Sequence, residues 1–266
     1  MVSFLQGTWF RLAHPVAICL LFSGMAVAQS APPAAPPPPS AAALKEKALL
    51  FYSHGSYVSA LTAFRQAANI GDVEAMMYVG VMYGSGQGTT VNYEEALDWF
   101  QKAAKAGDSQ AMNNIGLLYF QGLGRPKNYT EAMSWFRQGA DAGNSEAMFN
   151  LGVLYRDGLG ASVNYREAMR WFRRASDSGD AIANNEIGAL YQKGQGVEVD
   201  YGEAMKWYRK AADAGNNTAM FNIGQFYEEG LGVPADRDQA MTWYRMAAAA
   251  GNAAATDRLK NLEVKK

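Results

Sequence analysis

The sequence predicts an all-α fold, a stack of antiparallel helix pairs that repeats every 36 residues. Three observations predict it. One long pattern recurs at constant spacing, apolar residues within each copy follow the helical period, and helix start and stop signals recur at the same places. A unit this short is stable only when it packs against its neighbours. The five full copies and a final partial copy, a C-terminal capping helix, occupy residues 71–106, 107–142, 143–178, 179–214, 215–250 and 251–266.

The first 28 residues have the layout of a secretory signal peptide. A lone Arg11 precedes an apolar run from Val16 to Phe22, and small residues end the segment at Ala28. The run is short for a membrane span, although its retention as an anchor stays an alternative. We therefore expect a periplasmic or secreted protein that is cleaved after Ala28 and keeps no stable membrane anchor.

Charge and cysteine content restrict the function further. The 24 basic residues balance 25 acidic ones, so there is no charge excess for binding nucleic acid or an anionic membrane. The only cysteine, Cys19, lies inside the apolar run and lacks the context of a lipoprotein site. The mature chain would contain no disulfide, so packing alone would stabilise it.

A linker rich in proline and alanine, residues 29–43, follows the signal segment. Six prolines between Ser30 and Ser40 favour an extended conformation that buries nothing. We interpret the linker as a spacer, with a ligand for a proline-binding module as the alternative.

The next segment, residues 44–70, is interpreted as a divergent first hairpin. Helical patterns extend over 41–52 and 56–69, joined by a short turn that contains His54. The second pattern lies one period before the second helix of the first full copy. A polar first hairpin of this kind would cap the stack.

Each full copy carries the same start and stop signals. A glycine ends the preceding helix, and an Asp or Asn then caps the first helix, as Gly143 and Asn144 do in the third copy. The second helix begins with a capping box such as Asn164 with Glu167, in which each side chain is expected to bond the backbone N–H of the other residue.

Glycines and tryptophans recur inside the copies. A glycine in the middle of the first helix costs about 1 kcal/mol relative to alanine. Its recurrence predicts that a neighbouring helix passes too close for a methyl group. The Gly-x-Gly turn, Gly158–Gly160 in the third copy, lacks the strand and the lysine of a phosphate loop and predicts a left-handed turn. The tryptophans are interpreted as core residues. These glycines and tryptophans are Gly80, Gly116, Gly152, Gly188 and Gly224, and Trp99, Trp135, Trp171, Trp207 and Trp243.

This pattern resembles the Sel1-like repeat (SLR) family, a subclass of tetratricopeptide-like (TPR-like) solenoids. Departures are Arg237 in place of a tyrosine, Gly139 in place of an alanine, and the absence of the Gly-x-Gly turn from the first hairpin. The third copy carries the match at Ala147, Leu151, Gly152, Tyr155, Gly158, Gly160, Asn164, Tyr165, Ala168, Trp171, Phe172 and Ala175.

The resemblance implies a right-handed α–α superhelix whose first helices line the concave side. Relatives act as adaptors or assembly scaffolds. Exported bacterial relatives take part in envelope signalling, polysaccharide export or host contact, and some cysteine-rich ones are described as penicillin-binding or β-lactamase-like. Fold alone does not decide among these functions.

Catalytic constellations are missing from the sequence. Neither Ser-x-x-Lys nor Gly-x-Ser-x-Gly occurs, and His54 would be the only histidine after cleavage. Adjacent carboxylates such as Glu94 and Glu95 face different directions on a helix. We therefore predict no enzymatic activity, no catalytic residue, no metal site and no cofactor.

Candidate partner-binding residues are those that vary between copies at the first-helix positions expected to face the concave side. Asparagines in register can hold the backbone of an extended peptide, and apolar residues between them can form pockets. The alternative is that these side chains serve packing between copies. The candidates are Met77, Tyr78, Asn113, Asn114, Phe149, Asn150, Asn185, Glu186, Phe221 and Asn222, with Phe120, Arg156 and Gln192 one turn further on.

The sequence therefore predicts an exported, non-catalytic scaffold or adaptor that binds a protein or peptide on its concave face. One alternative is a structural component of an envelope or polysaccharide-export assembly, and another is a weak β-lactamase-like hydrolase. In a eukaryotic source, the glycosylation triplets at Asn128 and Asn216 would suit an adaptor of the endoplasmic reticulum.

Overall fold

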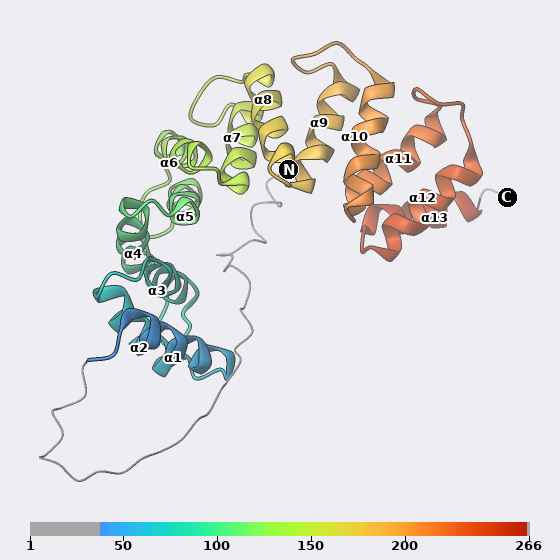
Figure 1. Ribbon diagram of the computed structural model, residues 1–266. Helices are drawn as coiled ribbons and strands as arrows, with labels where there is room; N and C mark the ends of the chain where they lie inside the picture. Colours follow the sequence, from blue (N-terminus) through green and yellow to red (C-terminus); the bar gives the residue numbers. More distant parts are fainter. Residues whose placement is uncertain (1–37, 265–266) are drawn as a thin grey trace, which may run out of the picture. The chain divides into compact units, whose positions relative to one another are not determined.

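The computed structural model describes residues 38–264, so the predicted signal segment and most of the predicted linker lie outside the described residues. Within the described range the secondary structure is entirely helical, with thirteen helices and no strands (Figure 1). The helices are α1 (Ala41–Ser53), α2 (Tyr57–Asn69), α3 (Val73–Ser85), α4 (Tyr93–Lys105), α5 (Ser109–Gln121), α6 (Tyr129–Asp141), α7 (Ser145–Asp157), α8 (Tyr165–Asp177), α9 (Ala181–Lys193), α10 (Tyr201–Asp213), α11 (Asn217–Glu229), α12 (Arg237–Ala249) and α13 (Ala253–Val264).

The described chain divides into two compact units. Unit 1 extends to Asn114 and includes Leu123–Arg125, whereas unit 2 comprises Ile115–Gly122 and everything from Pro126 onward. In each unit, helices that follow one another in the chain pack as pairs, and each pair packs against the next. This is the predicted all-α stack of helix pairs. No helix within residues 38–264 combines the length and apolar content that a membrane crossing requires.

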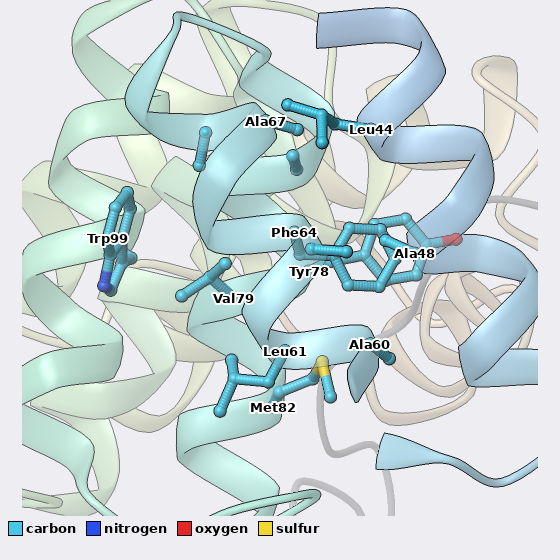
Figure 2. Packing of buried hydrophobic residues seen from close by; sticks show 13 residues of the cluster. Leu44, Ala48, Ala60, Leu61, Phe64, Ala67, Tyr78, Val79, Met82 and Trp99 are labelled. Carbon is cyan, nitrogen blue, oxygen red and sulfur yellow. The ribbon is translucent and has the colours of Figure 1, made fainter. Parts of the chain in front are cut away.

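The core of unit 1 joins the divergent first hairpin to the first full copy. Helix α1 begins at Ala41, inside the predicted linker, and the Ser40 hydroxyl caps it by accepting the Ala43 N–H at 3.2 Å. The rings of Phe64 and Tyr78 stack with centroids 4.4 Å apart. Figure 2 shows the two rings lying over one another among buried residues of α1, α2 and α3. The first hairpin is thus packed as a repeat unit.

The close approach predicted by the mid-helix glycines is confirmed. A methyl group on Gly152 of α7 would lie 2.5 Å from Cδ1 of Phe172 on α8, which real carbon contacts do not tolerate. Phe172 is fully buried against this glycine. The helix-propensity cost of glycine is therefore offset by burial of a whole aromatic ring, which contributes about 1.5–3 kcal/mol.

The predicted capping boxes form only in part. The Asn164 side chain accepts the Glu167 N–H at 3.1 Å, as predicted. The backbone N–H of Asn164 donates instead to the carbonyl oxygen of Tyr155 in the preceding helix, at 2.8 Å. The reciprocal half of the prediction is wrong because the tight turn already supplies that N–H with an acceptor. The turn thereby connects the two helices of a copy directly.

The Gly-x-Gly turn also contributes to packing between copies. Gly160 has φ of 79°, as the predicted left-handed turn requires, and a methyl group there would lie 2.6 Å from the carbonyl oxygen of Tyr129. Tyr129 opens the second helix of the preceding copy. The second glycine of the turn is therefore needed for packing between copies as well as for its backbone conformation.

The tryptophans depart from the predicted core role. Trp99 and Trp171 are buried, whereas the other three are only partly buried. Basic side chains lie over the rings. The Lys102 ammonium lies 3.6 Å from the Trp99 ring centroid, and the Arg174 guanidinium lies 4.3 Å from that of Trp171. These rings separate the core from a charged surface.

The C-terminal helix α13 differs from the first helices that precede it. Its position 260, which follows Gly224 by one period, is occupied by Lys260 in place of the recurrent glycine. Arg237, the residue that replaces the usual tyrosine, donates a hydrogen bond to the carbonyl oxygen of Leu262 in α13. This departure thus has a structural role, because Arg237 at the start of α12 attaches α13 to its own helix.

Candidate partner-binding surface

The predicted partner-binding residues all lie on the first helices of their copies, α3, α5, α7, α9 and α11. We call the corresponding part of unit 2 the first-helix ladder and define it as Phe149, Asn150, Arg156, Asn185, Glu186, Gln192, Phe221 and Asn222. Eight of the thirteen predicted site residues are buried, namely Met77, Tyr78, Asn113, Asn114, Phe120, Phe149, Asn150 and Asn185. Five remain partly accessible, namely Arg156, Glu186, Gln192, Phe221 and Asn222.

The site residues of unit 1 lie in its interior. Tyr78 stacks on Phe64, and burial raises the pKa of its hydroxyl above the ordinary value. Met77 is 6% exposed, and Asn113 and Asn114 are fully buried. These side chains therefore serve packing, the alternative that the sequence left open, and offer little surface to a partner.

The aromatic members in unit 2 pack against second helices. The Phe149 ring lies 5.5 Å from that of Phe172, and the Phe221 ring lies 5.4 Å from that of Tyr244. Phe120 meets Tyr129 edge-on at 5.3 Å. Phe221 alone among these three predicted residues keeps an intermediate exposure. It is therefore the apolar side chain of the ladder that a partner can touch.

The charged members form a bridge between two copies. Arg156 of α7 makes a two-pronged ion pair with Asp157, with distances of 2.7 and 2.8 Å. It also donates to Glu186 of α9. The hydrogen bond to Asp157, followed by the charge of Glu186, raises the pKa of the Arg156 guanidinium above its ordinary value. The two carboxylates compensate the charge of this cation. The Arg156–Glu186 bond also joins α7 to α9.

The bridge continues as hydrogen bonds between amides. The Asn185 amide donates to Glu186 at 3.2 Å, and its oxygen accepts from Asn222 of α11 at 3.0 Å. A continuous polar chain therefore links Arg156, Glu186, Asn185 and Asn222 across three successive first helices. An amide has two donor hydrogens and two acceptor lone pairs, so each retains capacity for a further partner.

A second set of hydrogen bonds ties the ladder to the second helices. The Tyr208 hydroxyl donates to Gln192 at 2.5 Å. Burial, followed by the charge of Glu186, raises the pKa of this hydroxyl, so Tyr208 remains a neutral donor. Gln192 is thus oriented by a buried ring of its own copy.

The same arrangement occurs one copy later, in residues that the sequence interpretation missed. The Tyr244 hydroxyl donates to Glu228 at 2.7 Å, and the Arg258 guanidinium of α13 also pairs with Glu228. Burial, followed by the bond to Glu228, raises the pKa of Tyr244. A signal was present in the sequence, because tyrosine replaces phenylalanine at 208 and 244 only in copies with a polar residue at 192 and 228.

The polar groups of the site are amides and paired charges, and the structure also places its one described histidine. Within residues 38–264, no group of three or more His, Cys, Asp or Glu side chains is placed to hold a metal ion. His54 lies at the end of α1, where its Nδ1 is 2.7 Å from the carbonyl oxygen of Leu50. The arrangement offers amides, paired charges and one accessible aromatic ring.

Comparison with known proteins agrees with this architecture. None of the curated proteins compared with the chain matches it significantly. A crystal structure of a Sel1 repeat protein from Oxalobacter formigenes is 33% identical, with a TM-score of 0.74, and the match covers 81% of this chain and 86% of that one. A protective antigen of uropathogenic Escherichia coli with an SLR fold is 30% identical, with a TM-score of 0.77. That match covers 83% of this chain and 48% of the antigen, so the chain spans about half of the antigen's length.

The family model for the Sel1 repeat matches five consecutive segments, offset by two residues from the copies defined by the opening glycine. The segments are 73–108, 109–144, 145–180, 181–216 and 217–252. Together they account for more than half of the sequence. The chain is therefore an all-helical solenoid that belongs to the Sel1-repeat family.

Proposed function

We propose that this protein is a non-catalytic scaffold whose first-helix ladder binds an extended peptide segment of a partner protein. Sel1-repeat proteins are generally protein-interaction scaffolds. The observation that carries the proposal is the polar chain from Arg156 through Glu186 and Asn185 to Asn222. It crosses three helices. The positions of Arg156 and Glu186 hold different residues in every other full copy, so the fold itself does not require this ion pair.

The groups of the ladder suit the backbone of an extended peptide. Peptide N–H and C=O groups need alternating acceptors and donors, and amide side chains supply both. Phe221 lies next to Asn222 and adds an accessible apolar surface for a side chain of the peptide. Because the ladder is already hydrogen-bonded, binding would cost little side-chain entropy. Its charges are paired, so recognition by shape and hydrogen bonding is favoured over recognition by net charge.

The test is selection from a library of random twelve-residue peptides displayed on phage. We expect enriched sequences to bind the wild-type protein. They should lose at least tenfold in affinity, about 1.4 kcal/mol, on a variant with Phe221→Leu and Asn222→Ala. Leucine retains most of the packing against Tyr244, so the fold should persist.

The matched control carries Arg245→Ala and Met246→Ala on α12, exposed residues on the other helix of the same copy. It should bind as the wild type does. Equal binding by both variants at unchanged melting temperature would place recognition elsewhere. Failure of the wild type to enrich any peptide would refute peptide binding itself.

We also propose export, supported by the signal-like segment 1–28 and the absence of any cysteine after Cys19. Expression of the full chain in a bacterial host, followed by N-terminal sequencing of the periplasmic fraction, should give Gln29 as the first residue. Recovery of a chain that begins at Met1 would contradict cleavage.

A further inference from the structure

Helices α8 and α10, the second helices of the third and fourth copies, carry a concentration of basic residues that the other copies lack. Four exposed positions of α8 are all arginine, and three of the same four positions in α10 are basic. In α6 the same positions hold Thr130, Ser134, Arg137 and Gln138, and in α4 they hold Glu94, Asp98, Gln101 and Lys102. The repeat therefore folds without this charge. We call Arg166, Arg170, Arg173, Arg174, Lys206, Arg209 and Lys210 the basic face.

Contacts between second helices make the basic face one continuous surface. The Lys210 ammonium of α10 donates to the hydroxyl of Ser176 on α8 at 2.9 Å. Ser176 in turn donates to buried Asn184 of α9 at 2.7 Å. On the other side of α8, the Arg137 guanidinium of α6 lies 4.9 Å from the Trp171 ring centroid. Helices α6, α8 and α10 are thus lateral neighbours within unit 2.

Neutral partners hold several of the arginines in place without compensating their charge. Arg173 donates to the Tyr191 hydroxyl at 2.6 Å, and Arg209 donates to the Tyr227 hydroxyl at 3.0 Å. Arg174 differs from these two, because it lies over the Trp171 ring and also forms a long ion pair of 3.8 Å with the exposed carboxylate of Asp141. These guanidinium groups are therefore ordered before any ligand arrives, which reduces the entropic cost of binding.

The charge pattern selects the kind of anion. Arg170 pairs with Glu167 and Lys206 with Glu203, and each basic side chain of these pairs is about three-quarters exposed. Asp177 and Asp213 end the two helices. Interspersed carboxylates repel a uniform polyanion such as nucleic acid or an anionic bilayer, but they leave room for discrete carboxylates set between them. The planar guanidinium matches a carboxylate with two parallel hydrogen bonds.

We propose that the basic face of α8 and α10 binds an acidic segment of a partner protein, rich in Asp and Glu. This is a second interaction surface, on other helices than the first-helix ladder, and it does not depend on peptide binding there. The net charge of the whole chain is −1, so the positive charge is confined to this surface. The basic face can therefore attract an acidic segment although the protein as a whole does not attract anions.

The chain itself offers a variant that should remain folded. Arg166→Thr, Arg170→Ser and Arg174→Gln give α8 the residues that α6 carries at the same positions. The probe is a fluorescein-labelled twenty-residue peptide of alternating Glu and Gly at about 0.15 M salt. We expect the variant to bind it at least about tenfold more weakly than the wild type does. The ladder variant with Phe221→Leu and Asn222→Ala should retain wild-type affinity.

A matched control removes the same charge elsewhere. Arg65→Ser, Lys105→Ser and Arg125→Ser replace three exposed basic residues of unit 1. An equal loss of affinity in this control would show that only the net charge of the protein matters, and it would overturn the proposal. Tighter binding to a DNA duplex, or to vesicles of equal parts phosphatidylglycerol and phosphatidylcholine, would overturn the assigned partner, as would no binding of the peptide by the wild type. Far-UV circular dichroism verifies that each variant is folded.

Discussion

At the contact between the mid-helix glycine and the facing aromatic ring, the third and fourth copies share one packing geometry and differ by a single hydroxyl group. In the third, Phe172 packs on Gly152, and in the fourth, Tyr208 packs on Gly188, with the nearest ring carbon 2.5 and 2.7 Å from the position of an added methyl group. The tyrosine additionally donates to Gln192. The fold requires the ring, whereas the hydroxyl connects the core to the first-helix ladder.

This difference shows where the repeat tolerates change. Removing the ring would leave a cavity in the core. The hydroxyl group, in contrast, only decides whether the ring bonds residue 192 or 228. In the third copy, Phe172 has no hydroxyl to bond the corresponding residue, Arg156. Arg156 pairs instead with Asp157 and Glu186. In the fourth and fifth copies, a partly exposed polar residue, Gln192 or Glu228, is therefore bonded to a core ring through one hydroxyl group.

The largest expected effect comes from adding a methyl group to the mid-helix glycines that face aromatic rings. Gly188→Ala and Gly152→Ala should each destabilise the protein by about 1–3 kcal/mol in urea unfolding, because the facing ring must move. The loss should be greater at Gly188, where movement of Tyr208 also breaks the bond to Gln192. Gly202→Ala is the control. It lies at the exposed start of α10, where other copies carry side chains, and should be neutral or stabilising by up to about 1 kcal/mol. A loss at Gly188 no larger than in this control would contradict the packing account.

A smaller effect is expected from removal of the hydroxyl alone. Tyr208→Phe should cost about 1 kcal/mol, since one hydrogen bond is lost and the core volume is kept. In a double-mutant cycle with Gln192→Ala, the coupling energy should be about 0.5–1.5 kcal/mol. The reciprocal change, Phe172→Tyr, should bring no comparable gain, because Arg156 is already paired. Additive losses at Tyr208 and Gln192 would show that the hydroxyl does not orient the ladder.

The smallest effect is a dependence on alkaline pH. The pKa of Tyr208 and that of Tyr244 are both raised above their ordinary value of 10.0. The unfolded chain therefore releases these protons first, and stability is lost as the pH rises above 10. Each tyrosine should contribute about 0.5 kcal/mol of loss between pH 10 and 10.5. A Tyr208→Phe and Tyr244→Phe double variant should show a shallower decline in unfolding free energy than the wild type. Parallel declines would mean that neither hydroxyl titrates differently on folding.

The sequence predicts the fold well because every helix start and turn signal recurs in five copies, so a signal that is weak in one copy is supported by the others. Helix starts such as Asn164, the left-handed turn at Gly160 and the close approach at Gly152 all follow from residue types that have one good structural explanation. The first hairpin is predicted by its register with the later copies, since it lacks the Gly-x-Gly turn.

The candidate site was less predictable, because spacing identifies a face but not what covers it. Met77 and Asn113 occupy the same position as Phe221, yet they are buried and Phe221 is partly accessible. Arg156 bonds Glu186 and Arg258 bonds Glu228, each partner 30 residues away in the sequence, a separation that helical periodicity does not address. The basic face was equally hidden, because its charge cancels in a count over the whole chain.

Lys260 has a consequence for what can pack against α13. The first helices α3, α5, α7, α9 and α11 each leave bare glycine backbone where the aromatic ring of the following helix packs. Gly224 receives Tyr244 in this way, but one period later the position carries the exposed side chain of Lys260. An aromatic ring could not approach α13 there as Tyr244 approaches α11, so this helix presents a charged side chain in place of a packing site.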